Sequence, residues 1–135
     1  MQEFHINYLA LLVAAAARIV VGGLWFSPLL FGRSWRTLVG CSEDDMKKRL
    51  PMLVPADFIT AFVMAFVLVH AVHYAGAATA SQGAIVGFFN WLGFVAVVTL
   101  MQTLYEARPL PLLFINNGFQ LMSLLVMGGI VAVWA

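Results

Sequence analysis

The stretch that decides the fold is residues 6–35, INYLALLVAAAARIVVGGLWFSPLLFGRSW. Its first two thirds are small and aliphatic apart from one arginine, Arg18, and it leaves through the glycine- and aromatic-rich segment Gly22–Pro28. A guanidinium near the centre of a bilayer costs about 2.5 kcal/mol or more. We therefore expect the rest of the chain to shelter this charge and to pair it.

The composition places the chain in a membrane. Of its 135 residues 63% are hydrophobic and 10% are charged, whereas soluble domains carry about 25% charged residues. Four apolar runs have about the 20 residues that a membrane span needs: Ile6–Phe26, Ala56–Tyr74, Gly83–Tyr105 and Leu112–Trp134. Because the connections are short, we predict an all-α integral membrane protein in which residues 1–135 form one up-down bundle of four transmembrane helices.

The basic residues predict the orientation of this bundle. Two connections carry all of those outside the spans: Arg33, Arg36, Lys47, Lys48 and Arg49 lie between the first and second spans, and Arg108 lies between the third and fourth. Positive loops stay in the cytoplasm, so we expect both termini outside. The net charge of +1 and the lack of a basic face give no reason to expect nucleic acid as a partner. The lipid bilayer is the expected one.

The first connection should have structure of its own. Pro28 cannot lie deep inside a helix without removing a hydrogen bond, so the chain should bend into the interface there, with Trp25 and Trp35 as aromatic anchors. Residues 42–49 then read as a short amphipathic cytosolic helix. Ser42 would cap it, and Pro51 would end it.

Polar side chains gather in the inner halves of the predicted spans. Arg18 lies near mid-membrane, and the other members of the cluster are Asp57, Gln102, Glu106, Asn116, Asn117 and Gln120. An unpaired charge there is strongly destabilising, so Arg18 should meet Glu106 or Asp57. One interpretation is a structural network that joins the helices. The other is a cavity that faces the cytoplasm and binds a small polar or anionic solute.

Two weaker patterns lie toward the outer side. The three histidines, His5, His70 and His73, could bind zinc or copper, could form a proton-sensing pair, or could be ordinary interfacial residues. Gly83 and Gly87 are four residues apart, a spacing that lets helix backbones approach closely, either within the bundle or between two copies.

Cys41 is the single cysteine, which excludes an intramolecular disulfide and a multi-cysteine metal site.

Several of these stretches together resemble one family. They are Asn7, Gly22-x-Leu24-Trp25-Phe26-Ser27-Pro28-Leu29 with Phe31-Gly32 and Trp35, Ser42-Glu43, Gly87-x-x-x-Trp91-Leu92-Gly93-Phe94, Glu106-x-Arg108-Pro109 and Asn116-x-Gly118-Phe119. In that order they are similar to the bacterial domain-of-unknown-function family 1761, over nearly the whole chain. The resemblance implies a small multi-span protein of the bacterial inner membrane, and it implies no reaction or substrate.

Three functions remain open at this point. The leading hypothesis is binding or transport of a small polar or anionic solute at the Arg18 cluster, by a parallel two-fold homodimer without a cofactor. The second is an accessory or structural membrane protein whose polar cluster only fixes helix packing. The third is a membrane enzyme that acts on a lipid or a quinone, with Glu106 as its only base. No nucleophile, base and acid stand in a catalytic pattern, so we do not expect an enzyme.

Overall fold

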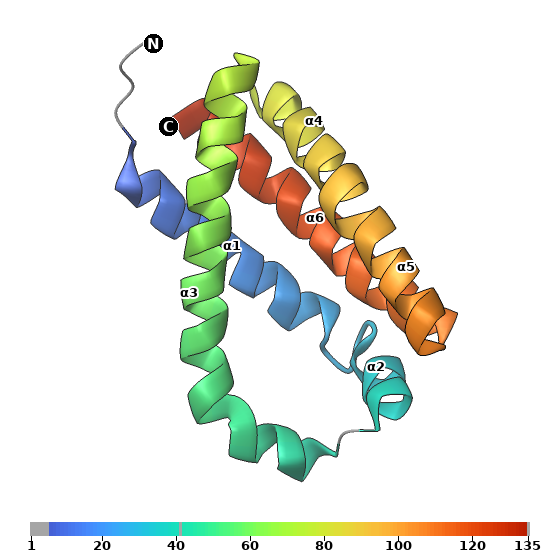
Figure 1. The fold of residues 1–135 in the computed structure, drawn as a ribbon. Coiled ribbons are helices and arrows are strands. Elements are labelled where there is room, and N and C mark those ends of the chain that lie inside the picture. The colour runs from blue at the N-terminus through green and yellow to red at the C-terminus, as the bar shows by residue number, and fades with distance from the viewer. Residues whose placement is uncertain (1–5, 41, 135) are drawn as a thin grey trace.

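The computed structural model describes residues 6–40 and 42–134, and this part of the chain is helical, without a strand (Figure 1). Four spans in it are long and apolar enough to cross a membrane, which confirms the predicted fold class. The elements are α1 (Tyr8–Trp25), α2 (Gly32–Val39), α3 (Glu43–Ala75), α4 (Ala80–Trp91), the π-helical turn η1 (Leu92–Ala96), α5 (Val97–Glu106) and α6 (Leu110–Trp134). The third span is the continuous run of α4, η1 and α5.

The first connection is more helical than the sequence suggested. α1 begins at its cap Asn7, whose side chain accepts hydrogen bonds from the backbone of the first turn. After Trp25 the chain turns sharply, with the amide of Gly32 bonded to the carbonyl of Ser27 at 2.9 Å. The helix α2 then forms from Gly32, where a side chain would overlap the Phe26 carbonyl. This helix was not predicted.

The expected end of a short loop helix at Pro51 is wrong. Ser42 does cap a helix, by accepting a hydrogen bond from the amide of Asp45 at 3.1 Å, but the helix continues through Pro51 and Pro55 as the 33-residue α3. Each proline removes one backbone hydrogen bond and bends a helix. The helix continues past both prolines because the long apolar part that follows is packed in the bundle. Figure 1 shows the resulting curve in the first third of α3.

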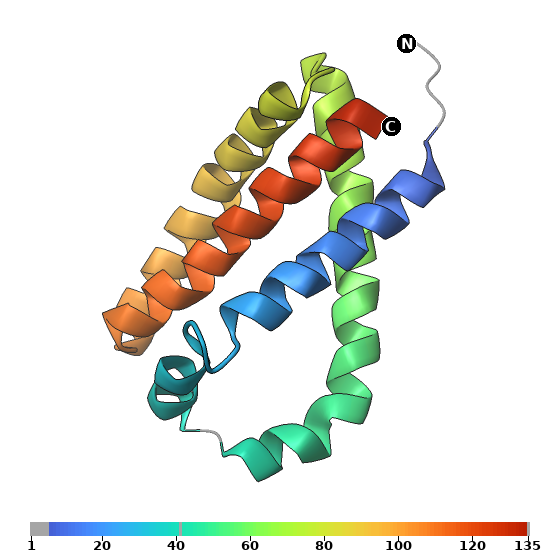
Figure 2. The same cartoon turned by 180° about the vertical axis from the view of Figure 1, so that it is seen from behind.

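The core lies where α6 meets the other three spans. α6 packs against α1, α3 and α4, and α1 crosses α3. Figure 2 shows α1 and α6 running side by side in front of α3. The largest buried cluster joins residues of these three helices: Leu11, Ala14, Ala65, Leu68, Val69, Val72, Leu124, Met127 and Val131.

The contact between α4 and α6 is close, because glycines face backbone there. A side chain at Gly83 would overlap the carbonyl of Gly128, and one at Gly87 would overlap the carbonyl of Leu124. Small residues allow this approach and the dispersion contacts that come with it. Of the two readings of Gly83 and Gly87, the structure therefore favours packing inside the bundle.

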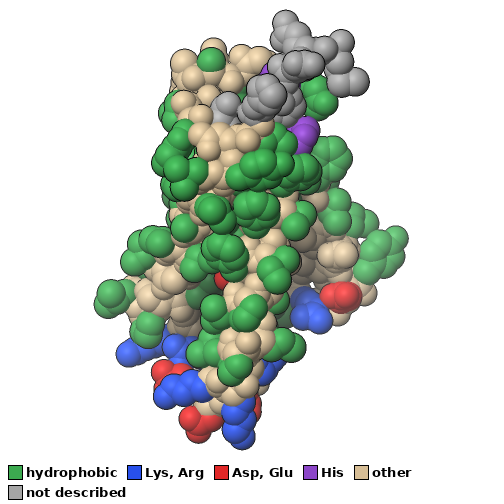
Figure 3. All heavy atoms as spheres, turned by 90° about the vertical axis from the view of Figure 1, so that its left-hand side faces the viewer, with side chains coloured by type: hydrophobic (Ala, Val, Ile, Leu, Met, Phe, Trp, Pro, Cys, Tyr) green, Lys and Arg blue, Asp and Glu red, His purple; other side chains and the backbone are tan. Residues whose placement is uncertain are grey.

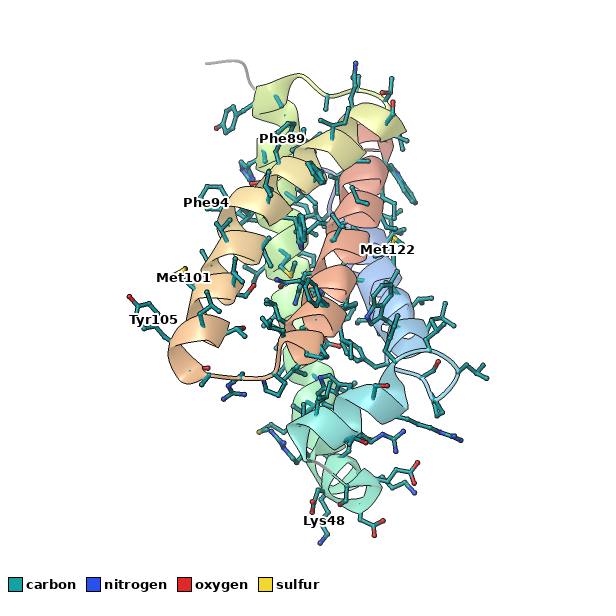
Figure 4. All side chains as sticks on the ribbon, turned by 90° about the vertical axis from the view of Figure 1, so that its right-hand side faces the viewer. Lys48, Phe89, Phe94, Met101, Tyr105 and Met122 are labelled. Carbon is teal, nitrogen blue, oxygen red and sulfur yellow. The ribbon has the colours of Figure 1, made fainter. Side chains whose placement is uncertain are left out.

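Charged and apolar side chains are segregated along the molecule. Lysine, arginine and carboxylate side chains gather at the end that holds α2 and the start of α3, and histidine lies near the opposite end (Figure 3). α1 begins and α6 ends at that opposite end (Figure 1). Between them the third span presents Phe89, Phe94 and Met101 outward (Figure 4). This is the distribution of a membrane-embedded surface with one charged end.

Candidate functional site

Arg18 is buried in the bundle, at 7% exposure. Its Nη1 donates to Oε1 of Gln120 at 2.9 Å, and its guanidinium carbon lies 4.6 Å from the centre of the Phe119 ring. Its Nε has no hydrogen-bond partner among the described residues. The charge is therefore held by one amide and one aromatic face, both from α6, rather than by a carboxylate.

The predicted ion pair between Arg18 and Glu106 is wrong. Glu106 instead binds its neighbour Arg108 at 2.8 Å, at the exposed end of α5. Asp57 attracts the guanidinium of Arg18, yet within the described ranges the two form no direct ion pair. The reason is geometric. Arg18 lies beside α6, where the side-chain amide of Gln120 is within hydrogen-bond distance of the guanidinium, whereas Glu106 is bound to Arg108 at the end of α5.

A pocket of about 520 Å³ opens beside this cluster, between α1, α2, α6 and the start of α3. Phe119 belongs both to this cluster and to the pocket, because its ring contacts Arg18 and also lines the pocket. Phe119, Phe26 and Trp35 form a continuous aromatic wall, with ring centres 5.1 Å apart for the first pair and 5.5 Å for the second. Gly22, one turn after Arg18, leaves the room that the Phe119 ring fills.

The rest of the pocket lining is both apolar and charged. Arg36 and Glu43 form an ion pair at 3.2 Å that joins α2 to α3, and Lys47 lies on the same face of α3. Asp57 lines this pocket and also the adjoining hollow of about 600 Å³ between α2 and α3. A mostly apolar cavity with a few charged groups is the usual form of a small-molecule site.

The other predicted site residues lie elsewhere. Gln102, Glu106, Asn116 and Asn117 line a smaller cavity of about 190 Å³ between α5 and α6. Asn117 is 9% exposed, and its Oδ1 lies 2.9 Å from the hydroxyl of Thr99. The predicted single cluster is thus two groups. Of its members Asp57 lines the larger pocket, and Arg18 with its partner Gln120 lies beside that pocket through its contact with Phe119.

Two tryptophans that sequence reasoning did not assign to the site fix the register of α6. Nε1 of Trp25 donates to the carbonyl of Ile115 at 2.9 Å, and Nε1 of Trp91 donates to the carbonyl of Asn117 at 3.0 Å. Gly118 leaves room for the Trp25 ring. A buried indole needs a hydrogen-bond partner for its N–H. The two tryptophans, together with Gly118 before Phe119, were therefore the sequence features that could have indicated these contacts with α6.

The metal site stays a prediction. His5 lies outside the described residues. His70 bonds its own helix, with Nδ1 2.7 Å from the carbonyl of Phe66, and the ring of His73 packs against Tyr74. No group of three metal-ligating side chains occurs in the part of the chain that the structure describes.

The comparison with protein families agrees with the resemblance noted in the sequence motifs. The family model described as "Protein of unknown function (DUF1761)" matches residues 9–132. The chain belongs to this family. No curated protein and no solved structure matches it. This DUF1761 member has four spans that are long and apolar enough to cross a membrane.

Proposed function

We propose that this protein binds a small polar or anionic solute in the pocket beside Arg18, at the cytoplasmic side of a bacterial inner membrane. One observation carries the proposal. Among the residues that the structure describes, this guanidinium at 7% exposure has no carboxylate in direct contact and keeps one N–H without a partner. Ionisable residues at membrane depth mark functional sites by default.

The position of the pocket supports the same proposal. Phe119 lines the pocket, and its ring lies 4.6 Å from the guanidinium carbon of Arg18. A rotation of this one ring would let an anionic group reach the free N–H, and side-chain rotamer changes of this kind are common on binding. The pocket opens at the charged end of the molecule, where a water-soluble solute arrives. Binding there is also the first step that a transporter would need.

The proposal is tested by ligand-dependent stability in lipid nanodiscs. Acetate, phosphate and 3-phenylpropionate serve as anionic probes, and thermal unfolding is followed by tryptophan fluorescence. A probe at about 100 times its Kd stabilises the folded state by about 2.7 kcal/mol. We expect at least one probe to raise the midpoint in the native chain and to lose this effect in Arg18→Met.

The matched control is Arg33→Met, which removes an exposed arginine outside the pocket and should leave the probe effect intact. If no anion stabilises the native chain, or if Arg18→Met responds as the native chain does, the binding proposal is wrong. Arg18 would then be a packing element, and the accessory or structural role would stand in its place.

The proposed orientation of the bundle in the membrane follows from the basic residues at the charged end of the molecule. With Lys47, Lys48 and Arg49 in the cytoplasm, both termini are outside. Cys41 is the single cysteine of the chain and lies in the same connection. A membrane-impermeant maleimide should therefore label it in inverted vesicles and not in intact spheroplasts, and the opposite pattern would reverse the assignment.

A parallel homodimer is the assembly we propose. Four helices make a thin wall around a pathway, and a second copy would thicken it. Gly83 and Gly87 already pack against α6, so the second copy would cover the apolar outer face of the third span, where Phe94 and Tyr105 are exposed. Native mass spectrometry from nanodiscs should give a species of two chains, and a single chain at all concentrations would refute it.

A further inference from the structure

The pocket contains a carboxylate that an anion would not need. Asp57 lines the pocket from α3, is exposed and accepts no side-chain hydrogen bond from the residues that the structure describes. In a site for an anion alone, this carboxylate would repel the ligand. A carboxylate of this kind is instead suited to a ligand's positive group.

The aromatic wall points to the same class of group. Phe26 and Trp35 line the pocket next to Phe119. Aromatic faces attract ammonium groups, and the attraction grows when the site is shielded from water. Arg18 already occupies one face of Phe119, which leaves Phe26 and Trp35 as the faces open to a ligand.

The other charges of the pocket compensate one another in part. Arg36 is paired with Glu43 at 3.2 Å, and Lys47 lies one helical turn from Glu43, a spacing at which opposite charges attract. Glu43 cannot balance both cations, so one positive charge remains there. Among the described residues Arg18 on α1 and Asp57 on α3 also form no direct ion pair, and these two charges are of opposite sign. The remaining lining is apolar, including Ile19, Met46 and Leu50.

We infer that the ligand is a small zwitterion with an apolar body, such as a hydrophobic amino acid. Its anionic group turns toward Arg18, its ammonium group binds Asp57 and the aromatic wall, and its apolar body lies against Ile19 and Leu50. A volume of about 520 Å³ falls in the range of pockets that enclose small organic ligands. This inference rests on the proposed function, since it names the ligand class of the same site.

The test compares three probes that share one ring and differ in their charges: phenylalanine, 3-phenylpropionate and phenethylamine. Binding to the full chain in nanodiscs is measured by calorimetry. We expect phenylalanine to bind at least about tenfold tighter than either singly charged probe, a difference of about 1.4 kcal/mol. Asp57→Asn should abolish its advantage over 3-phenylpropionate, and Arg18→Met its advantage over phenethylamine.

Asp44→Asn is the control, because it removes an exposed carboxylate on the same helix outside the pocket. If 3-phenylpropionate binds as tightly as phenylalanine and Asp57→Asn changes neither, the zwitterion inference is wrong while the anion site stands. If phenethylamine binds tightest in both the native chain and Arg18→Met, the inference and the anion site are both wrong. Equal or absent binding of all three probes also overturns the inference, and the comparison in the native chain needs no variant to fold.

Discussion

α6 has two faces that are built on opposite principles. Toward α4 it offers Gly128 to the glycines of its partner, and the two backbones meet without side chains between them. Toward α1 and α3 it offers Gln120, which binds the buried Arg18, and Phe119, which contacts Arg18 and lines a pocket. The first face is closed because nothing separates the helices. The second is packed into the core from Leu124 to Val131 and borders the pocket at Phe119, nearer the start of α6.

This difference teaches where the bundle can change and where it cannot. Backbone-to-backbone contacts have no flexible side chain that could yield, so the α4–α6 pair behaves as a rigid unit. Phe119 and the charged side chains around the pocket can change rotamer without moving a helix. A ligand bound as proposed would therefore be accommodated on the α1–α3 side, with the α4–α6 pair as its fixed support.

The largest effect should come from adding one carbon to the closed face. Gly83→Ala places a Cβ onto the carbonyl of Gly128, and such overpacking costs about 3 kcal/mol when neither backbone can move. Gly93→Ala in the same span meets nothing within 4 Å and should be close to neutral. Reversible unfolding in mixed detergent micelles measures both, and equal effects would show that the two helices are not rigidly held.

The next effect tests the open face. Gln120→Leu removes the only side-chain acceptor bonded to Arg18 in the described ranges and should destabilise the fold by about 2 kcal/mol, because a buried charged donor is left without its partner. Gln102→Leu, an exposed amide of α5 without a hydrogen bond to the described residues, should change little.

The double variant Arg18→Met with Gln120→Leu sharpens this test. Removing both members of a buried polar pair costs less than removing one, so the double variant should recover most of the loss of Gln120→Leu. If the two losses simply add, Gln120 does not hold the guanidinium, and the open face is not organised around it.

A smaller effect is expected where the tryptophan of α1 meets α6. Trp25→Phe keeps an aromatic ring but removes the N–H that donates to the Ile115 carbonyl at 2.9 Å, at a cost of about 1 kcal/mol. Trp134→Phe is the control, since Trp134 is half-exposed and donates to no described residue. A loss that is equal in the two variants would mean that the indole bond does not fix the register of α6.

The smallest effect concerns the polar contact between α5 and α6. Thr99→Val keeps the shape of the side chain and removes the hydroxyl that lies 2.9 Å from Oδ1 of Asn117. Hydrogen bonds between membrane helices average about 0.6 kcal/mol, so the loss should be of that size. Thr60→Val, whose hydroxyl bonds only its own helix, should lose less, and a larger loss there would contradict the assignment.

The fold could be predicted from the sequence because the bilayer restricts which segments can span it. A span must satisfy its own backbone and expose apolar side chains, so length and composition located the first, third and fourth spans to within a few residues of Tyr8–Trp25, Ala80–Glu106 and Leu110–Trp134. The second was located at its end only, because its helix begins at Glu43 rather than near Ala56. The error at Pro51 has a local cause. Propensity rules treat proline as an end, whereas the packing of a long apolar helix tolerates it as a bend.

The candidate site was readable only in part. The sequence marked Arg18 as a buried charge that must be held, because its cost in hydrocarbon depends on composition and depth alone. It placed Gln120 in the same cluster but expected a carboxylate to pair with Arg18, and it did not identify Phe119. It also did not separate Asn116 and Asn117 from the larger pocket.

The sequence by itself thus determined that this is a four-span, all-α membrane protein with one costly charge near its middle. Only the tertiary structure decided which neighbours hold that charge and which face of α6 stays open. The reason is physical. Spans follow from the transfer free energy of each segment, which is a local quantity, whereas partners follow from the rotation of each helix about its axis, which the packing of the whole bundle sets.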